Sequence, residues 1–471
     1  MCESSPCKQI ISAFTMPNRA KILKQQFMQS LGLPWQEILP ESRLDEILNE
    51  ENVSYRNSVY TPIVTLWAMV SQVFDPDKSL SNAVKRIISW IAAAGVECPS
   101  SDTGAYSKAR QRLPETVLQR LVPEVAESLE QQVPLAQQWC GRRVRVCDGT
   151  TVLMSDSAAN QAEYPQHRNQ KPGCGFPIAK LVVFFSLLTG GVVAACIAPL
   201  HWSEIVISRL LYSDLDWEDV LLADQAYGNY VDLAWVQQQG ADAVFRKHHA
   251  RQTDFRRGKK LGIGDHQVVW HKPKQCPKHM SDTEFAALPS TLLVREVCLR
   301  LSRQGFRDQV IIVVTTLLDA KRYSVRQLTR LYRLRWLAAE VNLRHLKTTL
   351  KMEMLTAKTP EMVRKEIWIH LFAYTLLRTL MWKATVASEY TPFQLSLQGA
   401  RQLFNHMSTL LATTMAKSLH KRLYQVLLQQ VATDLLPIRP DRSEPRVVKR
   451  RPKPFARMQQ PRPVLKAKLA A

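Results

Sequence analysis

Three acidic residues occupy places in the chain where a carboxylate could take part in catalysis. Asp148 lies in "CDGTT", Asp224 ends the apolar run "DVLLAD", and Glu340 lies in "LYRLRWLAAEVNLRHLKTTLKM", residues 331–352. Three carboxylates held together repel one another and are costly to bury unless cations balance them. Mg²⁺ prefers hard oxygen ligands, and two such ions about 3.5–4 Å apart activate the attacking oxygen at a phosphodiester. The three acids therefore predict a two-metal site for phosphodiester chemistry.

The segment around Glu340 places many bases beside an apolar stripe, and Glu340 is its one acid. A surface helix would usually spread or pair its charges, so this excess of bases predicts an anionic partner. DNA phosphates fit that role, because lysine and arginine that bind them also fix the position of the duplex. The bases would then bring the scissile bond to the metal ions.

Each acid also has a simpler structural interpretation. Asp148 alone is more often a turn residue, and Asp224 alone is more often a helix cap. Glu340 could pair with Arg344, one helical turn further on. Only the joint placement of the three acids in one sheet topology favours catalysis over these alternatives.

The composition supports a polyanion as the partner. The chain has 471 residues, a formal net charge of +22 and a pI near 9.7. Such a charge predicts nucleic acid as the partner, with an anionic membrane surface as the alternative. The nine cysteines form no CxxC pair and the first residues lack the apolar core of a signal peptide. We therefore expect a cytoplasmic protein.

The elements that must position these acids follow from apolar periodicity. The segment 142–154 alternates like a strand and carries Asp148. Further strands and helices are expected in the order strand 180–188, strand 192–198, helix 203–215, strand 219–224, helix 229–240 and strand 243–246. An antiparallel meander followed by parallel crossovers predicts an α/β fold with an RNase H-like (retroviral-integrase-like) catalytic core.

The uncharged segment 181–200 is long enough to span a bilayer. Thr189, Gly190 and Gly191 stand at its middle, between runs rich in valine and phenylalanine. These residues predict a buried β-hairpin with a glycine-containing turn rather than a membrane helix.

Composition and pattern divide the chain into four parts. We expect a helical N-terminal DNA-binding domain at 1–135 and a catalytic domain at 136–385, with a β-rich insertion at about 247–308. A helical region at 386–435 and a basic, disordered tail at 436–471 follow. In the first part, the basic helix 103–113 is either a DNA-reading element or a solvated charged face.

The segments "DGTT", "LLADQAYGNY" and "LYRLRW…E…NLRHLK" resemble the DDE transposases of bacterial insertion sequences, in the hairpin-forming branch with a Tyr-Arg-Glu-Lys signature. The likeness runs from about residue 100 to the basic tail. It implies that Asp148, Asp224 and Glu340 bind two Mg²⁺ ions, with Mn²⁺ able to substitute. It also implies that the DNA-binding signature residues are Tyr332, Arg335 and Lys347.

The same resemblance implies an endonuclease that acts as a homodimer on double-stranded DNA. It would nick the transposon end, form a hairpin through the freed 3′-hydroxyl, and join that end to target DNA in transposition. Two alternatives stay open. One is a catalytically inactive DNA-binding relative that acts as an inhibitor, and the other is an RNase H-like nuclease without strand transfer.

Two positions depart from the branch. Gln225 follows the second aspartate where arginine is usual, and the spacing from Arg335 to Glu340 is one residue longer than usual. On a regular helix the usual spacing keeps the four signature residues within roughly 60°, whereas the present spacing spreads them over roughly 140°. We predict a π-bulge between Trp336 and Glu340 that restores a shared face. The alternative is a regular helix whose long side chains reach around.

Two further features lie in the expected insertion. His266, His271, Cys276 and His279 could suggest zinc, but their spacing matches no standard zinc finger. Trp270 could stack on a base that has left the duplex, and packing in the core is an equal alternative.

Overall fold

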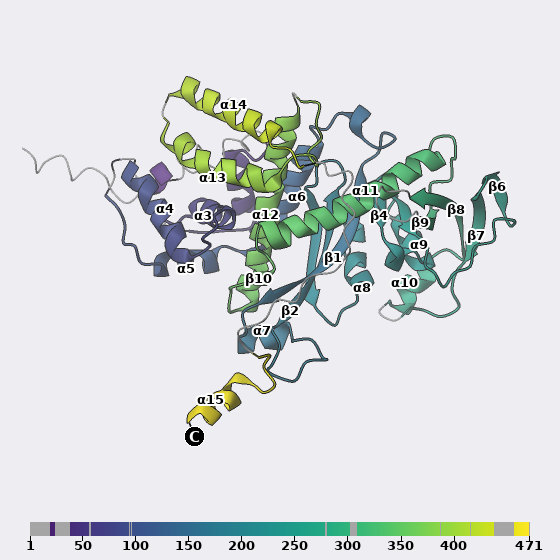
Figure 1. Cartoon of the computed structure of the whole chain (residues 1–471), viewed down its shortest axis with the longest axis horizontal. Coiled ribbons are helices and arrows are strands. Elements are labelled where there is room, and N and C mark those ends of the chain that lie inside the picture. Colours follow the sequence, from purple (N-terminus) through teal and green to yellow (C-terminus); the bar gives the residue numbers. More distant parts are fainter. Residues whose placement is uncertain are drawn as a thin grey trace, which may run out of the picture. The chain divides into compact units, whose positions relative to one another are not determined.

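The computed structural model divides the chain into two compact units (Figure 1). The first comprises residues 1–132 and 364–436, and the second comprises residues 133–363 and 437–471. The first is helical, and the second contains a large mixed sheet, which confirms the α/β class. The structure describes residues 19–23, 38–55, 58–93, 95, 97–277, 280–301, 309–386, 388–414, 416–437 and 456–470.

The helical unit draws its elements from both ends of the chain. Its main helices are α2 (Glu41–Glu50), α3 (Pro62–Phe74), α4 (Leu80–Ala93), α5 (Gly104–Arg112), α6 (Glu115–Glu130), α12 (Pro360–Thr385, from Arg364 onward), α13 (Leu397–Thr413) and α14 (Lys417–Thr433). Thr61 caps α3 through its side chain, and Pro62 occupies the first turn, where a missing N–H costs little.

Aromatic contacts join the N-terminal and C-terminal helices of this unit. The ring of Trp67 on α3 lies 6.1 Å from that of Phe372 on α12, and the ring of Phe74 lies 5.4 Å from that of Phe404 on α13. Most of α12 therefore belongs with the helical unit, whereas the sequence placed residues 360–385 in the catalytic domain. An apolar helix pattern shows that α12 is buried, but it does not show which partner buries it.

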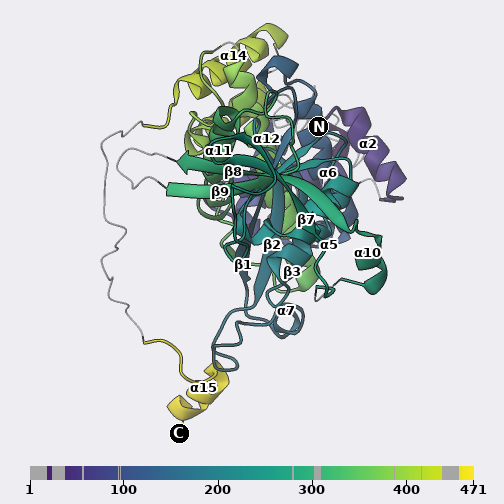
Figure 2. The same cartoon turned by 90° about the vertical axis from the view of Figure 1, so that its right-hand side faces the viewer.

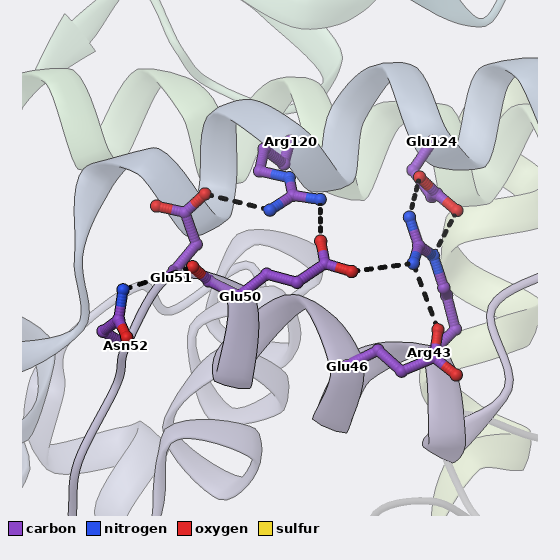
Figure 3. Close-up of polar contacts among 7 residues, drawn as sticks. All are labelled: Arg43, Glu46, Glu50, Glu51, Asn52, Arg120 and Glu124. Atoms are coloured by element: carbon purple, nitrogen blue, oxygen red, sulfur yellow. Dashed lines mark hydrogen bonds and ion pairs between the residues drawn. The ribbon is translucent and has the colours of Figure 1, made fainter.

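Ion pairs between α2 and α6 stabilise the outer part of the helical unit (Figure 3). Arg43 of α2 donates to both carboxylate oxygens of Glu124 on α6, at 2.7 and 3.1 Å. Arg120 of α6 pairs in return with Glu50 and Glu51 at the end of α2. The two helices are thus joined at two points by arginines on opposite partners.

The second unit is built on one sheet, which holds ten strands in the described residues. The strands are β1 (Val144–Met154), β2 (Ile178–Ser186), β3 (Val192–Pro199), β4 (Val220–Ala223), β5 (Asp242–Arg246), β6 (Lys259–Gly262), β7 (Asp265–His271), β8 (Thr291–Leu301), β9 (Gln309–Thr315) and β10 (Met354–Leu355). Their order across the sheet is β3-β2-β1-β4-β5-β9-β8-β7-β6, and β10 pairs with β1.

The first five strands have the order expected from the sequence. β1, β2 and β3 are antiparallel, whereas β4 runs parallel to β1 and β5 runs parallel to β4. Helix α8 (Glu204–Arg209) precedes β4, and α9 (Tyr230–Gln238) connects β4 to β5. The meander followed by parallel crossovers is therefore present, and it places Asp148 and Asp224 on adjacent strands or at their ends.

The uncharged segment 181–200 forms a hairpin. β2 and β3 are antiparallel neighbours, of which β2 is mostly buried and β3 is partly buried. The chain between them turns at Gly190, which has a φ of +75°. A positive φ of this kind suits glycine, because it has no Cβ. No helix in the described part of the chain is long and apolar enough to cross a membrane.

Helices lie on both faces of the sheet. Cys147 of β1 belongs to an apolar core that includes Ile207 of α8 and Leu233 of α9. Adjacent side chains on a strand point to opposite faces. Asp148 therefore faces away from α8 and α9, towards the face of β1 that α11 (Val325–Arg344) contacts.

The expected β-rich insertion extends the same sheet (Figure 2). β6, β7 and β8 continue from β9, which pairs with β5, and the short helix α10 (Asp282–Ala287) lies between β7 and β8. Trp270 of β7 is 2% exposed and donates to Glu296 at 2.9 Å, and the guanidinium of Arg251 lies 3.9 Å from its ring centroid. Trp270 is thus packed in the core, which favours the core-packing alternative over stacking on a base.

Part of the basic tail has regular structure. Residues 462–470 form helix α15 (Arg462–Ala470), although the sequence predicted disorder throughout 436–471. Pro461 lies beside Gly173 in the β1–β2 connection, where a Cβ on the glycine would be 3.1 Å from the proline ring. This contact gives the helix a site on the second unit. Residues 438–455 lie outside the described residues.

Candidate active site

Asp148 lies in the middle of β1, between β2 and β4. It pairs with Val183 of β2 and is partly buried. The N–H of Gly149 donates to its Oδ1 at 3.0 Å. Asp148 is therefore a strand residue facing α11, and the alternative interpretation as a turn residue is wrong.

The pKa of Asp148 is raised to about 6, chiefly by burial and also by the neighbouring carboxylates Glu204 and Asp224. The N–H of Gly149 and the charge of Arg335 oppose this rise in pKa, because both favour the carboxylate. Burial is the largest of these effects, so the pKa of Asp148 stays raised. A cation that comes close to such a carboxyl group stabilises its charged form.

Asp224 follows β4 directly. Val146 of β1 stands opposite Leu222 of β4, and two residues further in the same parallel register Asp148 would stand opposite Asp224. Oδ1 of Asp224 accepts the N–H of Ala226 at 2.8 Å, at the start of a 3₁₀ turn. The capping role expected as an alternative is therefore present. It is compatible with a second role, because the charge of Asp224 also acts on Asp148.

Helix α11 begins with a capping box formed by Ser324 and Gln327. The Ser324 hydroxyl accepts the N–H of Gln327 at 3.3 Å, and Oε1 of Gln327 accepts the N–H of Ser324 at 2.8 Å. The two residues satisfy N–H groups that have no partner within the helix. The start of α11 is fixed in this way, and the helix continues to Arg344 beside β1.

One pocket of about 510 Å³ brings together most of the residues expected in the site. It is lined by Asp148, Arg335, Ala339, Glu340, Leu343, Arg344, Lys347, Thr348 and Glu353. Glu340 is exposed at this pocket, and within the described residues no ion pair links it to Arg344. The alternative interpretation of Glu340 as an i,i+4 partner is therefore not supported.

The predicted irregularity between Trp336 and Glu340 is wrong. α11 is a regular α-helix from Val325 to Arg344, and Arg335 and Glu340 nevertheless line one pocket. The long side chains of Arg335 and Glu340 therefore reach the same pocket although the two residues point in different directions around the helix axis, as the alternative prediction stated. A π-helical turn does occur one turn later, at 345–349, where the N–H of Leu350 donates to the carbonyl of His345. This turn contains Lys347.

Tyr332 has a different environment from the other signature residues. It is 5% exposed, and the Arg335 guanidinium lies 5.3 Å from its ring centroid. Burial raises the pKa of its hydroxyl, whereas the charges of Arg335 and Arg246 lower it. Tyr332 does not line the pocket that contains Asp148. In this structure it supports the Arg335 side chain, and its contact with DNA stays a prediction.

Comparison with known proteins decides the family. The family model described as "Transposase DDE domain" matches residues 139–376, which include all six predicted site residues. The chain belongs to the DDE transposases of bacterial insertion sequences.

A curated relative and a solved structure are also similar to this transposase. It is 26% identical over 398 residues to "Transposase InsG for insertion sequence element IS4" of Escherichia coli (strain K12), with 82% of this chain and 85% of that protein covered. The piggyBac transposase in its synaptic complex with hairpin DNA is 8% identical, with a TM-score of 0.40 over 93% of this chain and 90% of that one.

No three histidine, cysteine or acidic side chains are grouped so that they could hold a metal ion in the described part of the transposase. This applies to the three predicted carboxylates and also to the cluster in the insertion. His266 is buried and contacts Glu296 and the carbonyl of Arg257, whereas His271 is exposed. His279 lies outside the described residues.

Three charged residues near the predicted site residues were not found from the sequence, and one of them, Arg246, acts on Tyr332. Glu204 begins α8, Arg246 ends β5, and Glu353 lines the pocket with Glu340. Arg246 could have been noticed, because it ends the strand next to the one that precedes Asp224. Glu204 and Glu353 carry no such signal, since each looks like an ordinary surface acid in its local sequence.

Proposed function

We propose that this transposase binds the ends of its insertion element, cleaves phosphodiester bonds there and joins the freed 3′-hydroxyl ends to target DNA. We infer that it does so with an RNase H-like (retroviral-integrase-like) core. The main support is the pocket in which Asp148 and Glu340 lie beside Arg335 and Lys347. Carboxylates next to strong cations suit a site that must hold both metal ions and phosphates.

The carboxylates of the site have the donor chemistry that Mg²⁺ or Mn²⁺ requires. Asp148, Asp224 and Glu340 offer hard oxygen ligands. Burial raises the pKa of Asp148, so a bound cation would favour its charged form. Two bound ions would activate the attacking oxygen and stabilise the leaving oxygen. The protein's part is to hold the carboxylates on a rigid strand, a capped turn and a capped helix.

The basic residues of α11 would hold the DNA backbone. Arg335, Arg344 and Lys347 line the same pocket as Asp148, and each can bind phosphate oxygens. Arg335 also rests against the Tyr332 ring, which limits the conformations of its side chain. These contacts would set the position of the scissile phosphate without reading bases.

The helical unit is a second candidate DNA surface. Helix α5 exposes Lys108 and Arg112, which line a pocket of about 930 Å³ within this unit. We propose that α5 contacts the element end. We also propose that two transposase molecules act together on a pair of ends, as the family resemblance implies.

The decisive test replaces each predicted metal ligand by its amide. We expect each of Asp148→Asn, Asp224→Asn and Glu340→Gln to abolish Mg²⁺-dependent cleavage of an element-end duplex. Each variant should still bind the same duplex in EDTA with the affinity of the wild type. The physical reason is that losing one anionic ligand weakens the shared metal site. Asp156→Asn, at an exposed aspartate just after β1, should cleave normally.

A fourth variant tests the choice of Glu340, because Glu353 lines the same pocket. Glu353→Gln should retain cleavage. If it abolished cleavage while Glu340→Gln did not, Glu353 would replace Glu340 in the site. A strand-transfer assay separates transposition from simple cleavage. A wild-type protein that binds ends in EDTA and never cuts with Mg²⁺ or Mn²⁺ would support the inhibitor alternative.

A further inference from the structure

On the face of β1 opposite to Asp148, the side chain of Glu204 lies against Gly149. A Cβ built on Gly149 would lie 2.5 Å from Cδ of Glu204 and 2.7 Å from its Oε2. No side chain heavier than hydrogen fits there unless Glu204 moves. The glycine of "CDGTT" therefore leaves room for the carboxyl group of Glu204 from α8, which would have to move if a larger residue stood there.

The same carboxyl group is bonded to the turn that follows Asp224. The Tyr227 hydroxyl donates to Oε1 of Glu204 at 2.9 Å. Tyr227 is 1% exposed and belongs to the 3₁₀ turn that Asp224 caps. A displacement of Glu204 would therefore displace the turn, and with it the backbone of Asp224.

Tyr227 belongs to the same buried cluster as Cys147 of β1. Its hydroxyl also interacts with the thiol of Cys147, which is buried on the face of β1 opposite to Asp148. α8 is anchored nearby, because the Ser203 hydroxyl accepts the N–H of Val206 and Ile207 is fully buried. Glu204 is thus held by α8. Its carboxyl group contacts both β1, which carries Asp148, and the turn that Asp224 caps.

We propose that Glu204 is a positioning residue that ties the turn after Asp224 to β1 beside Asp148. It sets the separation of the two aspartates from behind the sheet, on the face away from the pocket. This inference rests on the proposed function, since it assigns a role within the same site. It assigns Tyr227 and Gly149 as the partners through which Glu204 acts.

The test compares variants that keep or remove the hydrogen bond. Glu204→Ala removes both contacts, and Tyr227→Phe removes only the hydroxyl. Glu204→Gln retains an oxygen that accepts from Tyr227 and the size that fills the space above Gly149. We expect Glu204→Ala to lower the rate of Mg²⁺-dependent cleavage and the affinity for Mn²⁺, followed by electron paramagnetic resonance, by about 10–100-fold.

The other variants should follow from the hydrogen bond. Tyr227→Phe should reduce Mn²⁺ affinity and cleavage in the same direction, and Glu204→Ala/Tyr227→Phe should be no worse than Glu204→Ala alone, because the two residues act through one contact. Glu204→Gln should stay within about threefold of wild type. Glu163→Ala, at an exposed glutamate of the same unit, is the control and should behave as wild type.

Several results would overturn the proposal. Wild-type Mn²⁺ affinity and cleavage in Glu204→Ala or in Tyr227→Phe would remove the positioning role. A Glu204→Gln variant as impaired as Glu204→Ala would show that the negative charge matters instead of the hydrogen bond. If Asp148→Asn bound Mn²⁺ and cleaved like wild type, the proposed function would fail. Thermal unfolding and end binding in EDTA would show that each variant is folded.

Discussion

Gly228 shows how a single residue holds the turn that follows Asp224. A Cβ at this position would lie 2.2 Å from the carbonyl oxygen of Arg246 and 3.0 Å from the backbone nitrogen of His248. Both atoms belong to the backbone at the end of β5, so neither can move away as a flexible side chain would. The turn can approach β5 only because position 228 has no side chain.

We therefore expect Gly228→Ala to lower the free energy of unfolding by about 1–3 kcal/mol and to reduce cleavage, since the turn must move away from β5. Gly262→Ala is the matched control, because its Cβ would meet only the Asp265 Cβ at 3.8 Å, an ordinary contact. Urea unfolding of both variants measures the difference. Equal stability of the two would contradict the close approach seen at Gly228.

Arg335 and Lys347 provide the second prediction at the scale of residues. If each neutralises one phosphate, then Arg335→Ala and Lys347→Ala should each reduce the slope of log K against log salt by about 1. Arg330→Ala, at an exposed position of α11 that does not line the pocket, should leave the slope unchanged. The measurement is fluorescence anisotropy of an end duplex at several salt concentrations. An unchanged slope for both pocket variants would remove them from the DNA interface.

The sequence identified the residues that carry local signals and missed those defined by three-dimensional contacts. Asp148 and Asp224 were found because each stands in or just after an apolar strand. Glu204 was missed, because its closeness to Gly149 depends on how α8 packs against β1. The structure places Asp148, Arg335, Glu340 and Lys347 at one pocket.

At the scale of elements, the extra residue in the α11 signature was correctly observed, but the irregular turn was predicted at the wrong position. The sequence showed one extra residue in the signature, and the structure has a π turn at 345–349 instead of before Glu340. Lys351, with a φ of +53°, follows this turn, and the chain then reverses so that β10 pairs with β1. The irregular backbone thus lies where the helix must end and return to the sheet. Side-chain patterns give little information about that requirement.

The contact between α2 and α6 gives a pH prediction at the same scale. The side-chain hydrogen bond from Arg43 lowers the pKa of Glu124 below its usual value. A carboxyl group with a lowered folded pKa contributes stability above its unfolded pKa, and the contribution is lost as the pH falls through the folded pKa. The free energy of unfolding should therefore depend on Arg43 at neutral pH and not in strong acid.

Arg43→Ala should cost about 1 kcal/mol or less at pH 7, since the pair is partly solvated. This difference from wild type should shrink as the pH falls below about 4.3, the ordinary pKa of glutamate. Arg112→Ala, at an exposed arginine of α5, is the control and should change stability by less than about 0.5 kcal/mol. A pH-independent effect of Arg43→Ala would show that packing of its side chain matters more than the ion pair.

At the scale of the whole molecule, the strand order was predictable and the grouping of helices was not. Strands with strong apolar patterns have few sterically acceptable connections, so the order of β1 to β5 followed from the sequence. Helix α12 is apolar on most of its surface and could have packed on a sheet or on other helices. Its actual partners, α3 among them, are far away in sequence and no local pattern identifies them.

The last prediction concerns the basic tail, residues 436–471, which has eleven lysines and arginines against two acids and so contributes 11 − 2 = +9 of the net +22. Each cation that neutralises a phosphate steepens the salt dependence of binding by about 0.9. Deleting 437–471 should therefore flatten the slope of log K against log salt by several units, and should do so equally for end DNA and for unrelated DNA.

A shorter deletion separates α15 from the rest of the tail. Removing 459–471 takes away only three of the eleven cations, Arg462, Lys466 and Lys468, together with the contact of Pro461 with Gly173. If the tail acts only through its charge, this deletion should change the slope by at most about 3. A loss of preference for end DNA over unrelated DNA in either deletion would instead show that the tail contributes to sequence recognition. An unchanged slope after the longer deletion would show that the tail does not contact phosphates at all.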